Sequence, residues 1–126
     1  MKTIVLCGSM KFKDKIIEVS ENLKKLGFKV ELPEECMKGV PKELASRAHF
    51  NRIQNEESDA ILVVNCDKAD LQNYIGPNSF AEIAFAFYFH KKVFLLQDIY
   101  EPYKDELLGW NVIPLNNDLE SIKRYL

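Results

Sequence analysis

Short apolar segments alternate with segments of helical periodicity along the chain, and this alternation limits the possible folds. The short segments cover residues 3–6, 28–32, 60–64, 93–96 and 112–115, and in 28–32 apolar residues alternate with charged ones, as in a half-buried strand. Between the first two, apolar residues recur every three or four positions from Asp14 to Leu26, and Gly27 follows where such a helix would end. Strands that alternate with helices form parallel sheets with helices on both faces. We therefore predict a single α/β domain over residues 1–126 with a five-stranded, mostly parallel sheet.

Further elements complete this pattern. A second helix is predicted over residues 42–58 and a C-terminal helix over residues 118–126. The loop 68–78 is long for a compact domain, and loops of that length tend to be functional. Residues 99–109 form a second long connection, which is rich in aromatic and acidic residues.

Composition narrows the class of protein. A hydrophobic share of 47% with 29% charged residues is typical of a soluble globular domain, and a net charge of −2 provides no basic surface for nucleic acid. No apolar run reaches the length needed to span a membrane, and the first residues lack the features of a signal peptide. We expect a cytoplasmic protein whose partners are small molecules, with neither nucleic acid nor membrane among them.

The cysteines and histidines show no metal-ligand spacing. Cys7, Cys36 and Cys66 form no Cys-x-x-Cys pair, and the chain has only two histidines. We therefore expect free thiols, no structural metal and no cofactor. Cys7 and Cys66 fall at strand ends, where a small apolar side chain packs well. His49, on the predicted helix 42–58, is interpreted as a partly buried polar residue because nothing in the sequence pairs it with a nucleophile.

The segment 73–90 combines a turn with an apolar helix. After its Gly-Pro-Asn turn, the asparagine or Ser79 can cap a helix. Residues 80–89 are apolar on every face of that helix, and Glu82 is the exception. A helix that is apolar all round must be covered on all sides. Glu82, placed in the first turn, has two interpretations. It completes a capping box begun by Ser79, or it acts as a nucleophile or base at the mouth of a ligand crevice; both can hold at once.

The predicted five strands fit a flavodoxin-like, Rossmann-like order, in which ligands bind beyond the carboxyl ends of the strands. Polar and small residues follow those ends in four sets: Gly8, Ser9 and Met10; Asn65 and Asp67; Gly76, Asn78, Ser79 and Glu82; Gln97 and Asp98. We expect the four sets to converge on one crevice. Backbone N–H groups of the first and third sets would hold phosphate or sugar oxygens, and Met10, Phe12 and Tyr74 would cover a base.

Three segments stand in the order and at the spacing of a known family. They are Cys-Gly-Ser-Met at 7–10, Ser-Asp-Ala-Ile-Leu-Val-Val at 58–64, and 76–93. In these segments the chain resembles the nucleoside 2-deoxyribosyltransferase superfamily, which includes the deoxynucleoside 5′-monophosphate N-glycosidases. In that family a Gly-rich loop opens a helix whose early glutamate is the nucleophile, and Glu82 occupies that place. The family's glycine and serine of the first loop, here Gly8 and Ser9, help to hold the nucleoside or its phosphate.

The resemblance implies cleavage or transfer at the N-glycosidic bond of a (deoxy)nucleoside or its 5′-monophosphate. Glu82 would attack the anomeric carbon, as in other retaining glycoside chemistry. The family is typically dimeric or larger, and the apolar segments 80–89 and 100–110 predict the same homo-oligomer from the surface they expose. The alternative is a non-catalytic nucleotide-binding module on the same fold, since one fold hosts many functions.

One position departs from the family pattern. The family usually carries an Asp on the second helix, eight residues before the position of Asp59, and this chain has Asn51 there. An amide cannot donate a proton as a carboxylic acid does. Asn51 would orient Glu82 or hydrogen-bond the sugar, so protonation of the leaving group would need another group, such as Asp67, Asp98 or water.

Overall fold

A five-stranded parallel sheet forms the centre of the protein. The computed structural model describes residues 1–33 and 39–126, so Cys36 lies outside the described residues. The strands are β1 (Thr3–Cys7), β2 (Lys29–Glu31), β3 (Ala60–Val63), β4 (Lys92–Leu95) and β5 (Ile113–Pro114). They lie in the order β2-β1-β3-β4-β5 and all pair in parallel. The predicted α/β fold with flavodoxin-like order is confirmed.

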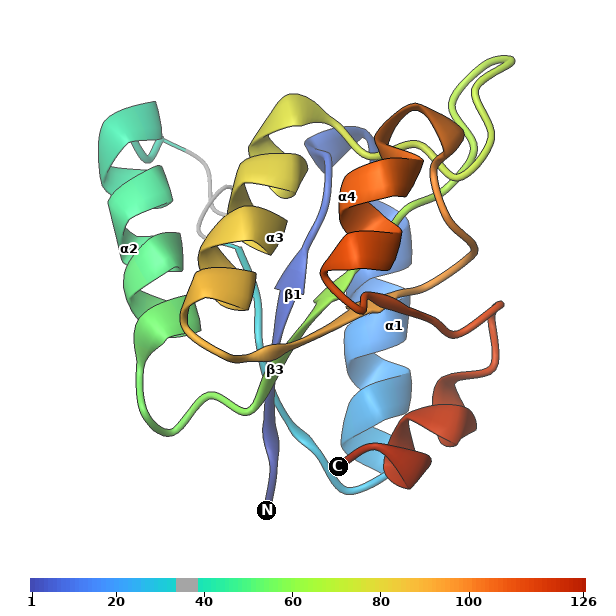
Figure 1. Ribbon diagram of the computed structural model, residues 1–126. Helices are drawn as coiled ribbons and strands as arrows, with labels where there is room; N and C mark the ends of the chain where they lie inside the picture. The colour runs from blue at the N-terminus through green and yellow to red at the C-terminus, as the bar shows by residue number, and fades with distance from the viewer. Residues whose placement is uncertain (34–38) are drawn as a thin grey trace.

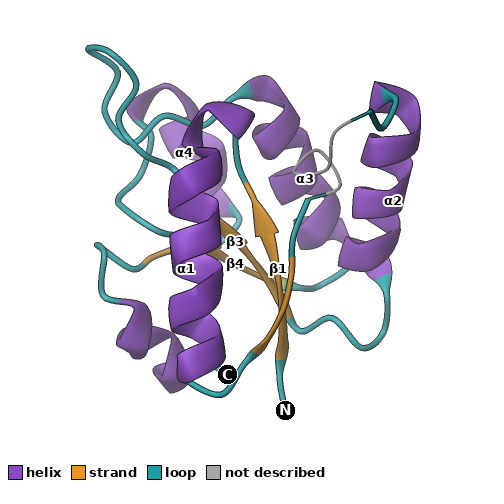
Figure 2. Cartoon of the chain, turned by 180° about the vertical axis from the view of Figure 1, so that it is seen from behind, coloured by secondary structure: helices purple, strands orange, loops and turns teal. Residues whose placement is uncertain are grey.

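Helices cover both faces of this sheet (Figures 1 and 2). The α-helices are α1 (Lys13–Lys25), α2 (Lys42–Gln54), α3 (Pro77–Tyr88) and α4 (Lys104–Gly109), and the 3₁₀ helices are η1 (Met10–Phe12), η3 (Glu101–Tyr103) and η4 (Leu119–Arg124). One face carries α2, α3 and α4, and the other carries α1 and η4. Within the described residues, no helix combines the length and the apolar character that crossing a membrane requires.

The pleat of β1 divides its side chains between two buried layers. Val5 and Cys7 pack in the layer beneath α2 and α3, whereas Ile4 and Leu6 pack against α1. β3 lies beside β1 in parallel register and alternates in the same way. Because both central strands are buried on both faces, every residue of each strand is apolar or nearly so. Cys7, the last residue of β1, therefore faces the layer that contains α2 and α3.

Aromatic rings join α3 to the connection that follows β4. The Phe80 ring lies 4.4 Å from the Tyr103 ring and 5.6 Å from the Trp110 ring, measured between centroids. Such pairs each contribute about 0.5–1.5 kcal/mol beyond the apolar area they bury. The sequence predicted residues 99–109 as a long connection, and most of it forms η3 and α4.

Two predicted helices have different limits in the structure. α2 ends at Gln54, four residues before the predicted end, because the Asn55 Oδ1 accepts a hydrogen bond from the Glu57 N–H at 2.8 Å. Asparagine side chains that bond the backbone two residues on compete with helical hydrogen bonds. The predicted C-terminal helix 118–126 is the shorter 3₁₀ helix η4.

The start of α3 also differs from the prediction. The helix begins at Pro77 with Gly76 as its N-cap, and no side chain caps it. Proline is favoured at the first helical position because its φ is preset and its missing N–H would have no partner there. Ser79 is thus inside the first turn, and the predicted capping box with Glu82 is wrong. Glu82 lies in the second turn of α3, not in the first.

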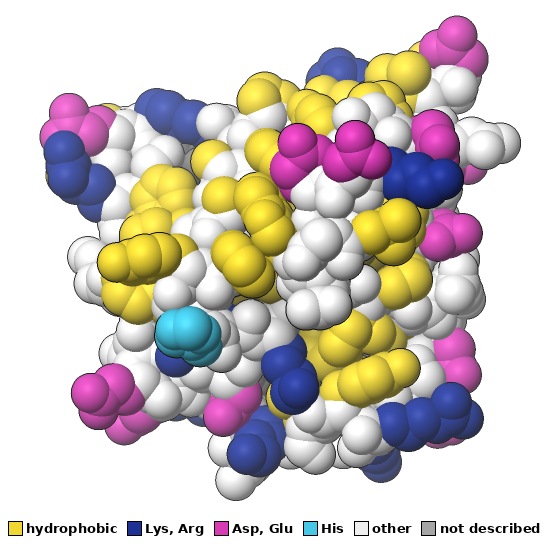
Figure 3. Space-filling view, viewed as in Figure 1, with side chains coloured by type: hydrophobic (Ala, Val, Ile, Leu, Met, Phe, Trp, Pro, Cys, Tyr) yellow, Lys and Arg dark blue, Asp and Glu magenta, His cyan; other side chains and the backbone are white. Residues whose placement is uncertain are grey.

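The outer end of α3 is exposed, so the prediction that the helix is covered on all sides is also wrong. Ser79, Ile83 and Ala86 are buried, whereas Phe87 and Tyr88 reach solvent. Figure 3 shows hydrophobic side chains gathered over this face of the molecule. Self-association through this surface stays a prediction.

Substitution of Phe94 in β4 tests how much the buried layer between the sheet and α1 contributes to stability. Phe94 is the largest of the fully buried side chains, so Phe94→Ala should reduce the free energy of unfolding by about 3–5 kcal/mol, measured by urea denaturation. Tyr88→Ala, at a ring that is 75% exposed, should change it by no more than about 0.5 kcal/mol. Equal losses for the two variants would contradict the burial of Phe94 in this layer.

Candidate active site

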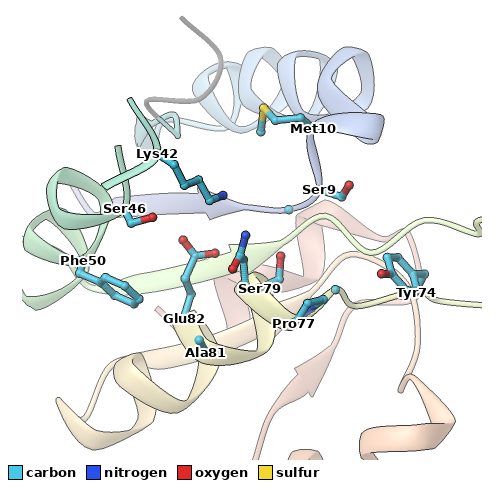
Figure 4. Close-up of a pocket in the computed structure, with 13 residues that line it drawn as sticks. Ser9, Met10, Lys42, Ser46, Phe50, Tyr74, Pro77, Ser79, Ala81 and Glu82 are labelled. Atoms are coloured by element: carbon cyan, nitrogen blue, oxygen red, sulfur yellow. The ribbon is translucent and has the colours of Figure 1, made fainter. Parts of the chain in front are cut away.

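A cavity of about 260 Å³ lies beyond the carboxyl end of β1, between α2 and the start of α3 (Figure 4). Seven of the residues predicted from the sequence line it: Gly8, Ser9, Met10, Gly76, Asn78, Ser79 and Glu82. Tyr74, predicted to cover a base, lines it as well. The cavity therefore forms where parallel α/β sheets usually bind their ligands.

The loop after β1 approaches its neighbours closely because it begins with glycine. A Cβ at Gly8 would lie 3.2 Å from the Val64 carbonyl oxygen and 3.2 Å from Ile16 Cδ1. A larger residue would force these neighbours to shift by a few tenths of an ångström, so the close approach favours glycine. The next residue, Ser9, accepts a hydrogen bond from the Lys11 N–H at 3.3 Å and caps η1.

Glu82 projects from α3 into the wall of the cavity and contacts a histidine. Its Oε2 lies 3.1 Å from Nε2 of His49, whose side chain is only 4% exposed. The Glu82 side chain is 15% exposed, so it reaches the cavity while most of its surface is buried. A carboxylate removed from water is costly unless it is paired. His49 provides that pairing when Nε2 carries its hydrogen and donates it to the carboxylate.

Cys7 completes a cluster around the same histidine. Its Sγ lies 3.3 Å from His49 Nε2, and the side chain is fully buried. The three residues come from β1, α2 and α3, which are far apart in sequence and meet in one layer. Their juxtaposition depends on the pleat of β1 and on the packing of α2 against α3.

Sequence reasoning missed the contribution of α2. His49 was interpreted without a nucleophile nearby, and the structure places it against Glu82. The spacing of His49 could have revealed that it is buried. Ala45, His49 and Ile53 recur every four residues, and they are the buried residues of α2. A neighbouring face of the same helix, also spaced by four, presents Lys42, Ser46 and Phe50 to the cavity.

Three predicted site residues lie outside this cavity. Asn51 is exposed on α2, and its Oδ1 accepts a hydrogen bond from Gln54 Nε2 at 3.3 Å. Asn65 is fully buried behind the loop ends, and Asp67 lines a second, polar cavity of about 300 Å³ with Gln97 and Asp98. The strand ends thus open into two cavities, so the predicted convergence of all four sets on one crevice is wrong.

Asn65 links the loop after β3 to the end of β4. Its Oδ1 accepts a hydrogen bond from the Gln97 N–H at 2.9 Å, and its Nδ2 donates to the Asp98 carbonyl at 2.8 Å. A third bond joins Nδ2 to the Asn73 carbonyl at 3.3 Å. A fully buried amide with these partners is a structural tie, because it fixes two loops whose backbone groups have no strand to pair with.

Replacing this amide with an apolar side chain of similar size should destabilise the fold. Asn65→Leu leaves the Gln97 N–H and the Asp98 carbonyl without their partner, so we expect a loss of at least about 2 kcal/mol in the free energy of unfolding. Urea denaturation measures it, with Asn22→Leu on the exposed face of α1 as the matched control. If Asn65→Leu lowered the free energy of unfolding no more than Asn22→Leu does, the structural role of Asn65 would be contradicted.

Comparison with known proteins supports the fold. A solved structure, the CMP N-glycosidase BcmB from Clostridium botulinum, superimposes with a TM-score of 0.64 over 90% of this chain and 87% of that chain. The two sequences are 21% identical. No protein-family model and no curated protein matches the chain. At this level of identity, the superposition supports the predicted α/β fold.

Proposed function

We propose that the protein cleaves the N-glycosidic bond of a nucleoside or nucleoside 5′-monophosphate, with Glu82 as the nucleophile. The observation that carries this proposal is the Glu82 carboxylate, held at 3.1 Å by a buried histidine in the wall of a cavity at the carboxyl end of β1. The fold shared with a CMP N-glycosidase supports the same reaction class.

The proposed reaction needs an oxygen nucleophile that is fixed in place. A Glu82 oxygen attacks the anomeric carbon as the bond from that carbon to the base nitrogen breaks, and the bonding electrons leave with the base. The base takes up a proton, and water then hydrolyses the glycosyl ester to release the sugar and restore the carboxylate. His49 is a positioning residue in this scheme, because its contact with Oε2 limits the directions in which the carboxylate can turn.

The groups around Glu82 fit a nucleotide. Lys42 projects into the cavity from the first turn of α2, and it is the only cationic side chain among the described residues that line it. The ammonium would hold a 5′-phosphate, together with the backbone N–H groups at the start of α3. Tyr74 and Phe50 offer aromatic surface for a base or a sugar face.

The nucleophile is tested by a substitution at Glu82. Glu82→Gln keeps the shape of the side chain but removes the charged oxygen, so base release should fall by about 10³-fold or more. Chromatography of base released from a panel of ribo- and deoxyribonucleosides and their 5′-monophosphates measures it, with and without a second free base to detect transfer.

Glu106→Gln is the matched control, because Glu106 is an exposed glutamate in the first turn of α4. It should release base as fast as the unmodified protein. Equal activity of Glu82→Gln and Glu106→Gln would remove Glu82 from the reaction.

A second prediction concerns the phosphate. Lys42→Gln removes the ammonium while keeping a polar side chain, so the KM for a nucleoside 5′-monophosphate should rise about tenfold or more, since hydrogen bonds to charged groups contribute about 1.5–3 kcal/mol. The KM for the matching nucleoside should stay within about twofold. A rise for both substrates alike would show that Lys42 does not recognise the phosphate.

A non-catalytic nucleotide-binding module is the second candidate. It is favoured by Asn51, which replaces the acidic residue of the family and lies on the exposed face of α2. Glu82 is also the only carboxylate among the described residues that line the cavity, so those residues offer the leaving group no second acid. Nucleotides that raise the melting temperature without being consumed in the same assay would establish this module in place of the enzyme.

A further inference from the structure

The cluster of Cys7, His49 and Glu82 brings together three different metal-ligating atoms. One ligand atom from each residue lies within 4.8 Å of the other two. Sγ to Nε2 is 3.3 Å, and Nε2 to Oε2 is 3.1 Å. Cys7 and His49 are buried, and Glu82 connects the cluster to the cavity. The three atoms come from one strand and two helices, so the juxtaposition does not depend on the conformation of a loop.

One hydrogen bond at His49 Nε2 does not account for both of its short contacts. Nε2 of an imidazole carries either one hydrogen or one lone pair, so it cannot make a full hydrogen bond to both the sulfur and the carboxylate oxygen. A cation between the three atoms would be bound by all of them at once. A thiolate, an imidazole and a carboxylate are also the three side chains that Zn²⁺ takes as ligands.

We infer that Cys7 Sγ, His49 Nε2 and a carboxylate oxygen of Glu82 form a binding site for Zn²⁺. Zinc–sulfur bonds of about 2.3 Å and zinc–nitrogen bonds of about 2.0–2.1 Å in a tetrahedron separate those two atoms by about 3.5 Å. The observed 3.3 Å requires an outward movement of only about 0.2 Å. Three protein ligands leave a fourth position for water or another ligand.

The donor set selects the class of metal. Mg²⁺ and Ca²⁺ take oxygen ligands, whereas sulfur and nitrogen donors favour zinc and the neighbouring transition metals. The Cys7 thiol must lose its proton to bind, and that proton passes to solvent as the metal enters. Binding is therefore weaker at lower pH, since protons compete for the sulfur and the imidazole.

Zinc at this site would inhibit the proposed reaction, and this consequence alone rests on the proposed function. The ion would draw charge from the carboxylate that attacks the sugar and would place a cation near the anomeric carbon, which develops positive charge. Occupancy of the site and N-glycosidase activity thus exclude each other.

Cobalt substitution tests the site without measuring activity. Tag-free protein, kept reduced with a phosphine and treated with a chelator that is then removed, is titrated with Co²⁺. We expect a near-ultraviolet band from sulfur-to-cobalt charge transfer and the visible bands of four-coordinate cobalt, both saturating at a single equivalent. Zn²⁺ should displace Co²⁺ and remove the bands, because it binds such ligands more tightly.

Two cysteine variants assign the sulfur. Cys7→Ser should lose the charge-transfer band, and the matched control Cys66→Ser should keep it. Cys66 is a half-buried thiol just past β3 whose pKa is raised by burial, and it lies outside the cluster. A parent protein without the band at saturating Co²⁺, or a band that persists in Cys7→Ser, would overturn the proposal.

Glu82→Gln keeps the proposal testable if Cys7→Ser fails to fold. Glu82 is the most exposed of the three ligands, and its amide analogue should keep the charge-transfer band but weaken Co²⁺ binding by more than about tenfold, since loss of even an outer partner of a metal ligand costs that much. Unchanged affinity would remove the carboxylate from the site. Because every readout is spectroscopic, a protein that binds cobalt but releases no base, or the reverse, separates the two proposals.

Discussion

The alternation of side chains along β1 determines what can meet beneath α2 and α3. A strand buried on both faces sends successive residues to opposite layers, so Val5 and Cys7 enter one core and Ile4 and Leu6 enter the other. A shift of one residue in the pairing with β3 would turn Cys7 toward α1 and bring Leu6 under the histidine. The register of the sheet therefore controls the chemistry at its edge as well as the packing of its centre.

The site itself depends on a polar contact inside an apolar layer. Glu82 and His49 lie on facing helices. Their side chains are mostly buried, so water solvates neither the carboxylate nor the imidazole as it would in solution. Such a pair is costly to form and is rarely the most stable choice for a helix interface, where two apolar residues of similar volume would pack without desolvating a carboxylate. Its presence beside a cavity supports the proposed role of Glu82.

The sheet could be predicted from the sequence because periodicity and segment length report burial directly. Glu82 could also be singled out, as an ionisable group in an otherwise apolar helix. The pairing of Glu82 with His49 could not, because it depends on how α2 and α3 pack across 33 positions of sequence, and propensities carry no such information. The role of Asn65 was hidden for a related reason: an asparagine after a strand has the same local pattern whether it ties loops together or binds a ligand.

The ring contacts of Phe80 have an optical consequence. Phe80 precedes Glu82 by two residues on α3, and its ring stacks at 5.6 Å on Trp110, which also stacks at 5.2 Å on Phe87 near the other end of the same helix. Trp110 is the only tryptophan of the chain. Any displacement of α3 that accompanies filling of the cavity must alter the surroundings of that indole, so the protein carries an intrinsic fluorophore coupled to the helix that bears Glu82.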